Sequence, residues 1–482
     1  MILRRIVVLS CAGLLLACAA NPPYQPAAPE LPVSWKLEAP WREGQPQDRL
    51  PKGAWWQAFD DAALAALEQQ AIAGSPTLAL AQARLLQARA VLAASSASAL
   101  PQIGLSARGA SQKISANRPL TNYNAPNFST VQEDLSLALT VGYELDLAGR
   151  VQQTIAGASA SAQQAAADLE NTRLVLSADL AANYFNLREI DAELDVVERS
   201  IALQRRSLEL VTARYDLGAA SGIELAQQQT LLESTLVQLE LLRRQRGQFE
   251  HALAALSGAA APNFNLPVDR REHLPPAVPL GLPSDLLQRR PDIAAAERAM
   301  AAANAQIGVA NAAFYPSILL GSALGLESRD LTTLFDAPSL LWSIGLSAAQ
   351  TLYDGGRIRA NVDFASAGYA AATANYRRVV LLAMQEVEDG ITGLVTLERA
   401  ALQARTAMAA ARKTFEMTQA RYEGGASPYL DVVMAQQALL TSERQTVQLH
   451  GQQLVTSVFL IKALGGDWQR AQATASKQAG AD

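Results

Sequence analysis

Four stretches of the chain alternate between hydrophobic and polar side chains. The clearest begins at Leu135 and reads LSLALTVGYELDL, with a large hydrophobic side chain at every odd-numbered position and small or polar residues between them. A period of two is typical of a β-strand with one apolar face. The same alternation predicts strands at about 102–112, 134–147, 317–327 and 340–353, in two pairs joined by polar loops.

An apolar strand face suits two different settings. A soluble antiparallel sheet buries that face against a core, whereas an outer-membrane wall turns it toward lipid. In the second setting Thr140, Glu144, Asp146 and Ser347 would face a lumen. Four strands cannot close a membrane barrel, because about eight is the smallest number observed. A membrane wall would therefore need strands from several chains.

Two long segments without proline follow the strand pairs, from Gly149 to Tyr215 and from Gly356 to Tyr422. At 1.5 Å per residue, each would form a helix roughly 100 Å long. Both carry apolar side chains at alternating steps of three and four, in the same register 207 residues apart, which predicts a coiled-coil seam. The first seam comprises Ile190, Leu194, Val197, Ile201, Leu208, Val211 and Tyr215, with Gln204 in one polar slot, and the second comprises Leu397, Ala401, Ala404, Met408, Phe415, Thr418 and Tyr422.

Each long segment ends in a turn of nearly the same sequence. The first reads ARYDLGAASGIELAQQQ from Ala213, and the second reads ARYEGGASPYLDVVMAQQ from Ala420. Gly218 in the first turn, and Gly424 or Gly425 in the second, favour the left-handed conformation that ends a helix. The pattern predicts two long helical hairpins, each with its tip at one of these turns.

Cap residues predict where the returning helices begin. Ser221 and Glu224 form a capping box, and Ser427 before Pro428 is a second candidate cap. Shorter helices of about 24 residues are predicted between Pro76 and Pro101 and between Pro291 and Pro316. Each of these runs directly into a strand.

The N-terminus indicates export and a lipid anchor. Residues 1–17 place Arg4 and Arg5 before an apolar run, which is the layout of a secretory signal. The stretch LLAC ending at Cys18 resembles the lipobox of bacterial lipoproteins, in which this cysteine carries the covalent lipid. The alternative is that ACA is an ordinary cleavage site and Cys18 leaves with the signal. Beyond the signal, no apolar run reaches the roughly 20 residues of a transmembrane helix.

Little in the chain indicates catalysis or cofactor binding. Without the signal there are 38 basic and 45 acidic residues, a balance that does not favour nucleic acid as a partner. The three histidines are scattered without metal-ligand spacing, and DGGR at Asp354 lacks the lysine and hydroxyl of a phosphate-binding loop. We expect neither an enzyme nor a bound metal or cofactor.

Several motifs together resemble the OprM/NodT family of outer-membrane factors, which are relatives of TolC. The resemblance covers nearly all of the mature chain and rests on the two hairpin tips and four further motifs. These motifs are YELDLAGR from Tyr143 with its copy LYDGGR from Leu352, RRPDIAAAE from Arg289, and AFYPS from Ala313.

The resemblance implies a mainly α fold with a transmembrane β-barrel, built from two repeats. Three chains would close a twelve-stranded barrel in the outer membrane, and their long helices would form an α-barrel across the periplasm. The expected organisation is a signal peptide (1–17), a lipidated N-terminal segment (18–60), a first repeat (61–261), a proline-rich linker (262–284), a second repeat (285–466) and a C-terminal tail (467–482). The N-terminal segment and the linker would form an equatorial belt.

The family likeness also implies a function, namely the exit duct of a tripartite multidrug efflux system. The partners would be a periplasmic adaptor, an inner-membrane RND-type transporter and outer-membrane lipid. Adaptor contacts would fall on the first tip, and a periplasmic gate would fall on the second. The implied adaptor-contact residues are Arg214, Tyr215, Asp216, Gly218 and Glu224, and the implied gate residues are Arg421, Tyr422, Leu430 and Asp431.

The second tip departs from the family pattern. Where family members often read Leu-Asp-Ala-Gln and then Arg, this chain has Val433, Met434, Ala435, Gln436 and Gln437. A salt-bridged lock at these positions is therefore in doubt, and an apolar ring at Leu430 is the expected constriction. Two alternative functions stay open: a duct for proteins or metal ions, and a periplasmic coiled-coil lipoprotein without a pore.

Overall fold

The computed structural model describes residues 53–118, 129–276 and 289–466. Contacts divide these residues into two compact units. The first unit takes residues 84–166 and 295–376, and the second takes the remainder. Each unit draws on both sequence repeats, because each long helix passes from one unit into the other. The signal, Cys18 and the tail 467–482 lie outside the described residues.

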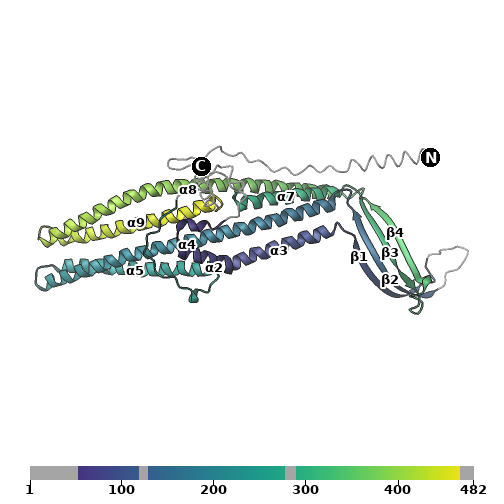
Figure 1. Cartoon of the computed structure of the whole chain (residues 1–482), viewed down its shortest axis with the longest axis horizontal. Helices are drawn as coiled ribbons and strands as arrows, with labels where there is room; N and C mark the ends of the chain where they lie inside the picture. Colours follow the sequence, from purple (N-terminus) through teal and green to yellow (C-terminus); the bar gives the residue numbers. More distant parts are fainter. Residues whose placement is uncertain (1–52, 119–128, 277–288, 467–482) are drawn as a thin grey trace, which may run out of the picture. The chain divides into compact units, whose positions relative to one another are not determined.

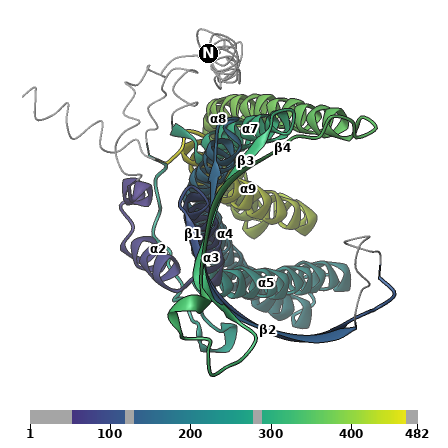
Figure 2. The ribbon, with the colours of Figure 1, turned by 90° about the vertical axis from the view of Figure 1, so that its right-hand side faces the viewer.

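The first unit contains one antiparallel sheet with strand order β1-β2-β3-β4. The sheet is strongly curved (Figure 2). The central pair β2–β3 joins the two sequence repeats, so the repeats share one sheet. Within the described residues, the outer edges of β1 and β4 have no partner strand. The strand bounds are β1 (Gln102–Ile114), β2 (Thr130–Leu145), β3 (Ser317–Ser328) and β4 (Leu340–Ala349).

The four predicted strands are present, but β2 spans Thr130–Leu145 rather than the predicted 134–147, and the predicted end of the last strand is wrong. β4 ends at Ala349, not at 353, and Ala349 pairs with Ser317, the first residue of β3. Pro316 precedes that residue and has no backbone N–H to continue the ladder. The residues beyond are left out of the sheet, so Leu352 is 93% exposed and Tyr353 is 90% exposed.

Helices make up most of the rest (Figure 1). The two long helices, α4 and α8, have 67 residues each and begin 207 residues apart, which confirms the predicted pair. α5 and α9 return from them and have 35 residues each. The bounds are η1 (Trp55–Phe59), α2 (Ala62–Gly74), α3 (Pro76–Ala97), α4 (Arg150–Asp216), α5 (Gly222–Leu256), η2 (Ala261–Asn263), α7 (Pro291–Ala312), η4 (Ala337–Ser339), α8 (Arg357–Glu423) and α9 (Tyr429–Ala463).

Two apolar clusters hold the hairpins of the second unit together. One joins α4, α5 and α9 around the predicted seam of α4, whose residues Ile190, Val197 and Ile201 are all buried. The other lies nearer the tips and joins α4, α8 and α9 around Val211 and Phe415. The seam prediction is wrong at its last position, because Tyr215 is 46% exposed. Its repeat partner, Tyr422, is buried.

A buried carboxylate fastens the N-terminal segment and the linker to α4. Asp61 caps α2, and Oδ1 accepts the backbone N–H groups of Ala63 and Leu64 at 2.8 and 3.1 Å. Oδ2 accepts the Tyr184 hydroxyl at 2.6 Å and lies 3.2 Å from His273 Nδ1. Burial by itself would raise the pKa of this carboxyl, but the bonds from His273 and Tyr184 hold the pKa well below its usual range. The described part of the linker is thus anchored at His273.

No helix among residues 53–118, 129–276 and 289–466 combines the length and the apolar character that crossing a membrane requires.

Candidate functional site

The strand register sorts the sheet into two chemically different faces. Opposed residues of an antiparallel pair carry their side chains on the same face. One face is almost wholly apolar, half-buried along most of β2 and β3 and exposed along β4, where Trp342, Ile344 and Leu346 are 71%, 69% and 65% exposed. Its members are Ile103, Leu105 and Ala107 of β1, Leu137, Leu139, Val141, Tyr143 and Leu145 of β2, Ile318, Leu320, Ser322, Leu324 and Leu326 of β3, and Leu340, Trp342, Ile344, Leu346 and Ala348 of β4.

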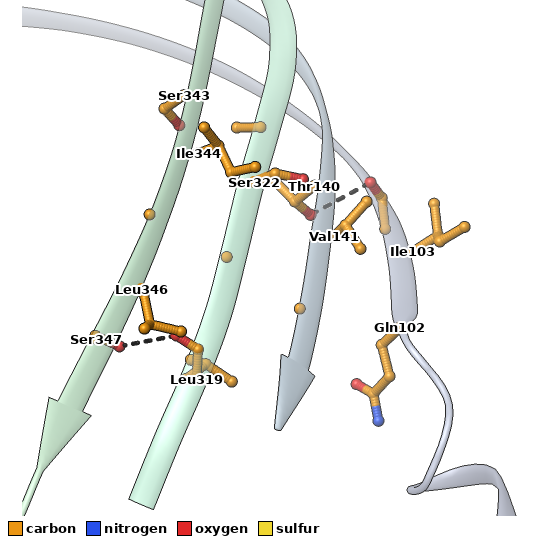
Figure 3. A pocket seen from close by; sticks show the side chains of 15 residues that line it. Gln102, Ile103, Thr140, Val141, Leu319, Ser322, Ser343, Ile344, Leu346 and Ser347 are labelled. Atoms are coloured by element: carbon orange, nitrogen blue, oxygen red, sulfur yellow. Dashed lines mark hydrogen bonds between the residues drawn. The ribbon is translucent and has the colours of Figure 1, made fainter. Parts of the chain in front are cut away.

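The opposite face is mostly polar or small, with Leu319 and Leu341 among its large apolar members. Thr140, Glu144 and Ser347 all lie on it, since Glu144 is opposite Leu319 and Leu319 is opposite Ser347. The Thr140 hydroxyl donates to the Gly104 carbonyl at 3.3 Å, and the Ser347 hydroxyl donates to the Leu319 carbonyl at 3.4 Å (Figure 3). The hydroxyls satisfy backbone acceptors of neighbouring strands. The predicted common face of these three residues is therefore present.

A row of small residues crosses the middle of the polar face. Gly142, Gly321 and Gly345 are opposed across three strands, with Gln102 at the end of the row. No atom lies within 4 Å of a Cβ built on any of the three glycines. The three glycines and Gln102 are among the residues that line an open hollow of about 780 Å³, part of which Figure 3 draws.

Acidic side chains begin the two long helices just beyond the sheet. Asp146 lies one residue past β2, and its Oδ2 accepts the Gln152 N–H at 2.7 Å. Asp354 accepts the N–H groups of Gly356 and Ile358 at 2.9 and 2.7 Å. Carboxylates at helix N-termini are stabilised by the helix dipole. Asp146 thus acts as a helix-start residue, and whether it also faces a lumen stays a prediction.

Glu144 is paired with a cation at the same junction. Its Oε2 lies 2.6 Å from Arg150 Nη2, and its Oε1 accepts Arg150 Nε at 2.9 Å. Arg150 is the first residue of α4. The bidentate pair offsets much of the negative charge that Glu144 brings to the polar face.

At the other end of α4 and α8, the two hairpin tips are linked. Tyr422 of α8 donates its hydroxyl to the Glu224 carboxylate of α5 at 3.1 Å. The Arg214 guanidinium of α4 lies 4.8 Å from the centre of the Tyr422 ring, and the Tyr429 ring lies 4.9 Å from it. Four helices therefore meet at one tyrosine. Burial raises the pKa of Tyr422 above its ordinary value, so its hydroxyl stays a donor at neutral pH.

The other predicted tip residues lie outside this cluster. Arg421 reaches only its own turn, where Nη2 donates to the Ala426 carbonyl at 3.4 Å. Leu430 is 49% exposed, and Asp431 is exposed in the first turn of α9. Asp216 is exposed on the first tip, and Gly218 has a φ of 73°, as the predicted helix end requires.

Two features of the tips differ from the sequence predictions. Ser427 is not the cap of α9: the helix begins at Tyr429 after Pro428, and the Ser427 hydroxyl is buried without a hydrogen-bond partner. Ser221 does cap α5 by accepting the Glu224 N–H at 3.3 Å. The Glu224 carboxylate, however, bonds Tyr422 of the other hairpin.

Sequence reasoning missed other residues at the tips. Leu217 and Ile223 are the most exposed large apolar side chains of the first tip. Gln228 is fully buried and accepts the Tyr429 hydroxyl at 2.7 Å. Large apolar side chains beside a glycine turn are visible in the sequence, but the glutamine gives no signal, because its partner lies 201 residues away.

In the parts of the chain that the structure describes, no three His, Cys, Asp or Glu side chains are placed to hold a metal ion.

Comparison with known proteins places this geometry in a family. Residues 67–259 and 282–466 match the family model described as outer membrane efflux protein. The chain is 29% identical over 472 residues to the pyoverdine export outer membrane protein OpmQ of Pseudomonas aeruginosa, covering 97% of this chain and 98% of OpmQ. It is 30% identical to the toluene efflux pump outer membrane protein TtgF of Pseudomonas putida, covering 94% and 95% of the two chains. Its structure is similar to that of the outer-membrane channel OprN, with a TM-score of 0.85 at 27% identity, covering 94% of this chain and 100% of OprN.

Proposed function

Because this chain belongs to the outer membrane efflux protein family, we propose that three copies of it form the exit duct of a tripartite efflux system. The observation that carries the proposal is the sheet with one apolar face and one polar face. A strand wall of this kind can face lipid on one side and water on the other. The lipid face would hold Trp342, Ile344 and Leu346, and the lumen face would hold Thr140, Glu144 and Ser347.

The two free edges of the sheet support a closed ring. The two edges are different strands, β1 and β4. Pairing of β4 of one chain with β1 of the next is therefore a heterologous contact, and such a contact can repeat from chain to chain until a ring closes. Three chains would supply twelve strands, an even number in the range of single-chain outer-membrane barrels. The second unit is compatible with the same closure, because both of its flanking helices expose apolar side chains. These are Val237 and Leu241 on α5, and Leu381, Leu402 and Met417 on α8.

The hairpin tips would be the inner end of the duct. The exposed Leu430 would form an apolar constriction in the ring of three, and the contacts of Tyr422 would hold the second hairpin in its resting position. A periplasmic adaptor would dock on the first tip, where Leu217 and Ile223 are exposed beside the predicted contacts Tyr215, Asp216 and Gly218. Arg214 and Glu224 would contribute to the link between the hairpins instead, because both contact Tyr422.

The duct would carry its cargo passively, driven by an inner-membrane RND-type transporter. Drugs or other small amphiphiles are the cargo that we propose, and the names of the relatives OpmQ and TtgF likewise refer to small molecules, pyoverdine and toluene. Cys18 would carry a lipid in the outer membrane.

A planar-bilayer recording on the purified, assembled protein tests this function. We expect a trimer-sized particle and long-lived conducting events. A protein that inserts without conducting would support the alternative of a coiled-coil lipoprotein without a pore. A second experiment identifies the cargo class. It compares the drug and solvent susceptibility of a strain that lacks this gene with that of a control strain that lacks the neighbouring pump genes.

A further inference from the structure

Three glutamines are buried where α9 packs against the first hairpin. Gln204 of α4 and Gln228 of α5 are fully buried, and Gln436 of α9 is 3% exposed. Gln204 occupies the one polar slot of the α4 seam, between the buried Ile201 and the partly buried Leu208. A polar residue in an apolar seam lowers stability but restricts the register in which helices pack.

Gln228 is the glutamine whose amide is paired at both ends, and it links the two hairpins. The Tyr429 hydroxyl of α9 donates to Gln228 Oε1 at 2.7 Å, and Gln228 Nε2 donates to the backbone carbonyl of Gln204 at 2.8 Å. The bonds run from α9 through α5 to α4, and both are buried. Removal of the Gln228 side chain would leave the Tyr429 hydroxyl buried without an acceptor, which is unfavourable.

The other two glutamines are only half satisfied. Gln204 Nε2 donates to the Ser200 hydroxyl at 3.1 Å, and Gln436 Nε2 donates to the Ser207 hydroxyl at 3.0 Å. Oε1 of each side chain is buried without a hydrogen-bond partner. Turning either amide over would exchange the unpaired oxygen for an unpaired nitrogen. Gln228 is thus paired at both ends of its amide, whereas Gln204 and Gln436 each keep one buried acceptor unpaired, although Gln436 also bonds Ser207 of the other hairpin. An unpaired buried acceptor costs more than one hydrogen bond contributes, so we expect Gln204 and Gln436 to lower the stability of this interface.

We propose that these glutamines set the balance between two registrations of the second hairpin against the first. Gln228 stabilises the resting registration through Tyr429. Gln204 and Gln436 favour departure from it, because movement of α9 along the seam gives their unpaired amide atoms new partners or water. The inference rests on the proposed gated duct. It assigns a positioning role to residues in the interface between the two hairpins, farther from the turns than the predicted gate residues.

The test compares single-channel recordings of leucine variants, since leucine keeps most of the side-chain volume. Gln228→Leu should raise the resting open probability about tenfold, the factor expected from loss of one buried hydrogen bond. Tyr429→Phe removes only the hydroxyl of the same bond and should act in the same direction. Gln204→Leu and Gln436→Leu should lower the open probability, and should lower adaptor-dependent export in cells, about tenfold. The matched control is the exposed neighbour of Gln228, Gln229→Leu, which should match the parent protein.

The decisive result is that open probability rises in Gln228→Leu and Tyr429→Phe but falls in Gln204→Leu and Gln436→Leu. If all three buried glutamine variants opened the channel, or if all matched the control, the proposed balance would be wrong. Protease resistance of the purified trimers checks that each variant is folded, and Tyr429→Phe provides the evidence if Gln228→Leu does not fold. The outcome also separates this inference from the proposed function. A parent protein that never conducts contradicts the duct itself, whereas a conducting parent with unresponsive glutamine variants contradicts only the balance.

Discussion

Tyr422 and Glu224 are 198 residues apart in the chain and share a 3.1 Å hydrogen bond between the tips of the two helical hairpins. Tyr422 has a counterpart of the same type, Tyr215, in the other repeat, but only Tyr422 is buried in the contact. The two similar turn sequences thus have different roles. The second tip supplies the Tyr422 side chain, and the first tip supplies Arg214 and Glu224, which contact Tyr422.

Breaking this bond should favour the open duct. Tyr422→Phe and Glu224→Ala should each raise the resting conductance, because a hydrogen bond to a charged group contributes about 1.5–3 kcal/mol. The double variant should be less than additive, since both changes remove the same interaction. Single-channel recordings measure this, and Tyr215→Phe is the matched control. Strict additivity would show that the two side chains act independently.

The constriction should respond to its apolar side chain more than to its charge. Leu430→Ser should raise the resting conductance, with little dependence on salt, because no exposed charge pair is screened. Asp431→Ala should have a smaller effect. Conductance at low and high salt distinguishes an apolar gate from an electrostatic one. The gate would be electrostatic if Asp431→Ala leaked more as salt increased while Leu430→Ser conducted like the parent protein.

The two faces of the sheet should tolerate charge differently. Leu346→Arg should destabilise the inserted protein by about 2–4 kcal/mol if residue 346 lies near the bilayer midplane. Ser347→Arg, one residue away on the other face, should assemble normally. The yield of folded trimer in outer membranes measures both. Greater harm from Ser347→Arg would reverse the assignment of the faces.

The contact between α2 and α4 should weaken as pH rises. Burial raises the pKa of the Glu68 carboxyl to about 8, and neither of its oxygens has a hydrogen-bond partner in the described residues. The folded protein therefore holds a proton that the unfolded chain releases above pH 4.5. The contribution of this proton to the free energy of unfolding is fully present below pH 4.5. It falls by at most about 1.4 kcal/mol per pH unit as the pH rises to about 8.

Substitution of this carboxyl isolates the effect. Glu68→Gln should abolish the decline, while the exposed change Glu240→Gln should keep it. Hydrogen exchange of the α2 amides at pH 6 and pH 8.5 reports the local stability. Equal pH dependence in Glu68→Gln and the parent protein would assign the decline to another group.

The proposed lipid anchor, Cys18, lies outside the described residues and is tested by labelling. Cys18→Ser should abolish incorporation of a radiolabelled fatty acid and should change the processing of the precursor. Trimer assembly should persist, because the proposed strand wall is an anchor of its own. Labelling that survives the change would show that Cys18 is not the acylated residue.

The sequence by itself determined the elements and the faces. Period-two alternation identified the strands and their apolar side, and the repeat at 207 residues identified two helices that begin and end in equivalent positions. Such features are local, because backbone geometry repeats every two or 3.6 residues. The glycine at the end of α4 was also predictable, since a φ of 73° at Gly218 is strained for other residues.

Only the tertiary structure decided which of two equivalent residues becomes a contact. Tyr215 and Tyr422 follow the same local pattern, yet one is exposed and the other meets Glu224, because packing of one hairpin on the other breaks the symmetry of the repeats. The end of β4 depended likewise on Pro316 at the start of its partner strand. The buried bonds of Gln228 join positions 24 and 201 residues away, and no local period records them.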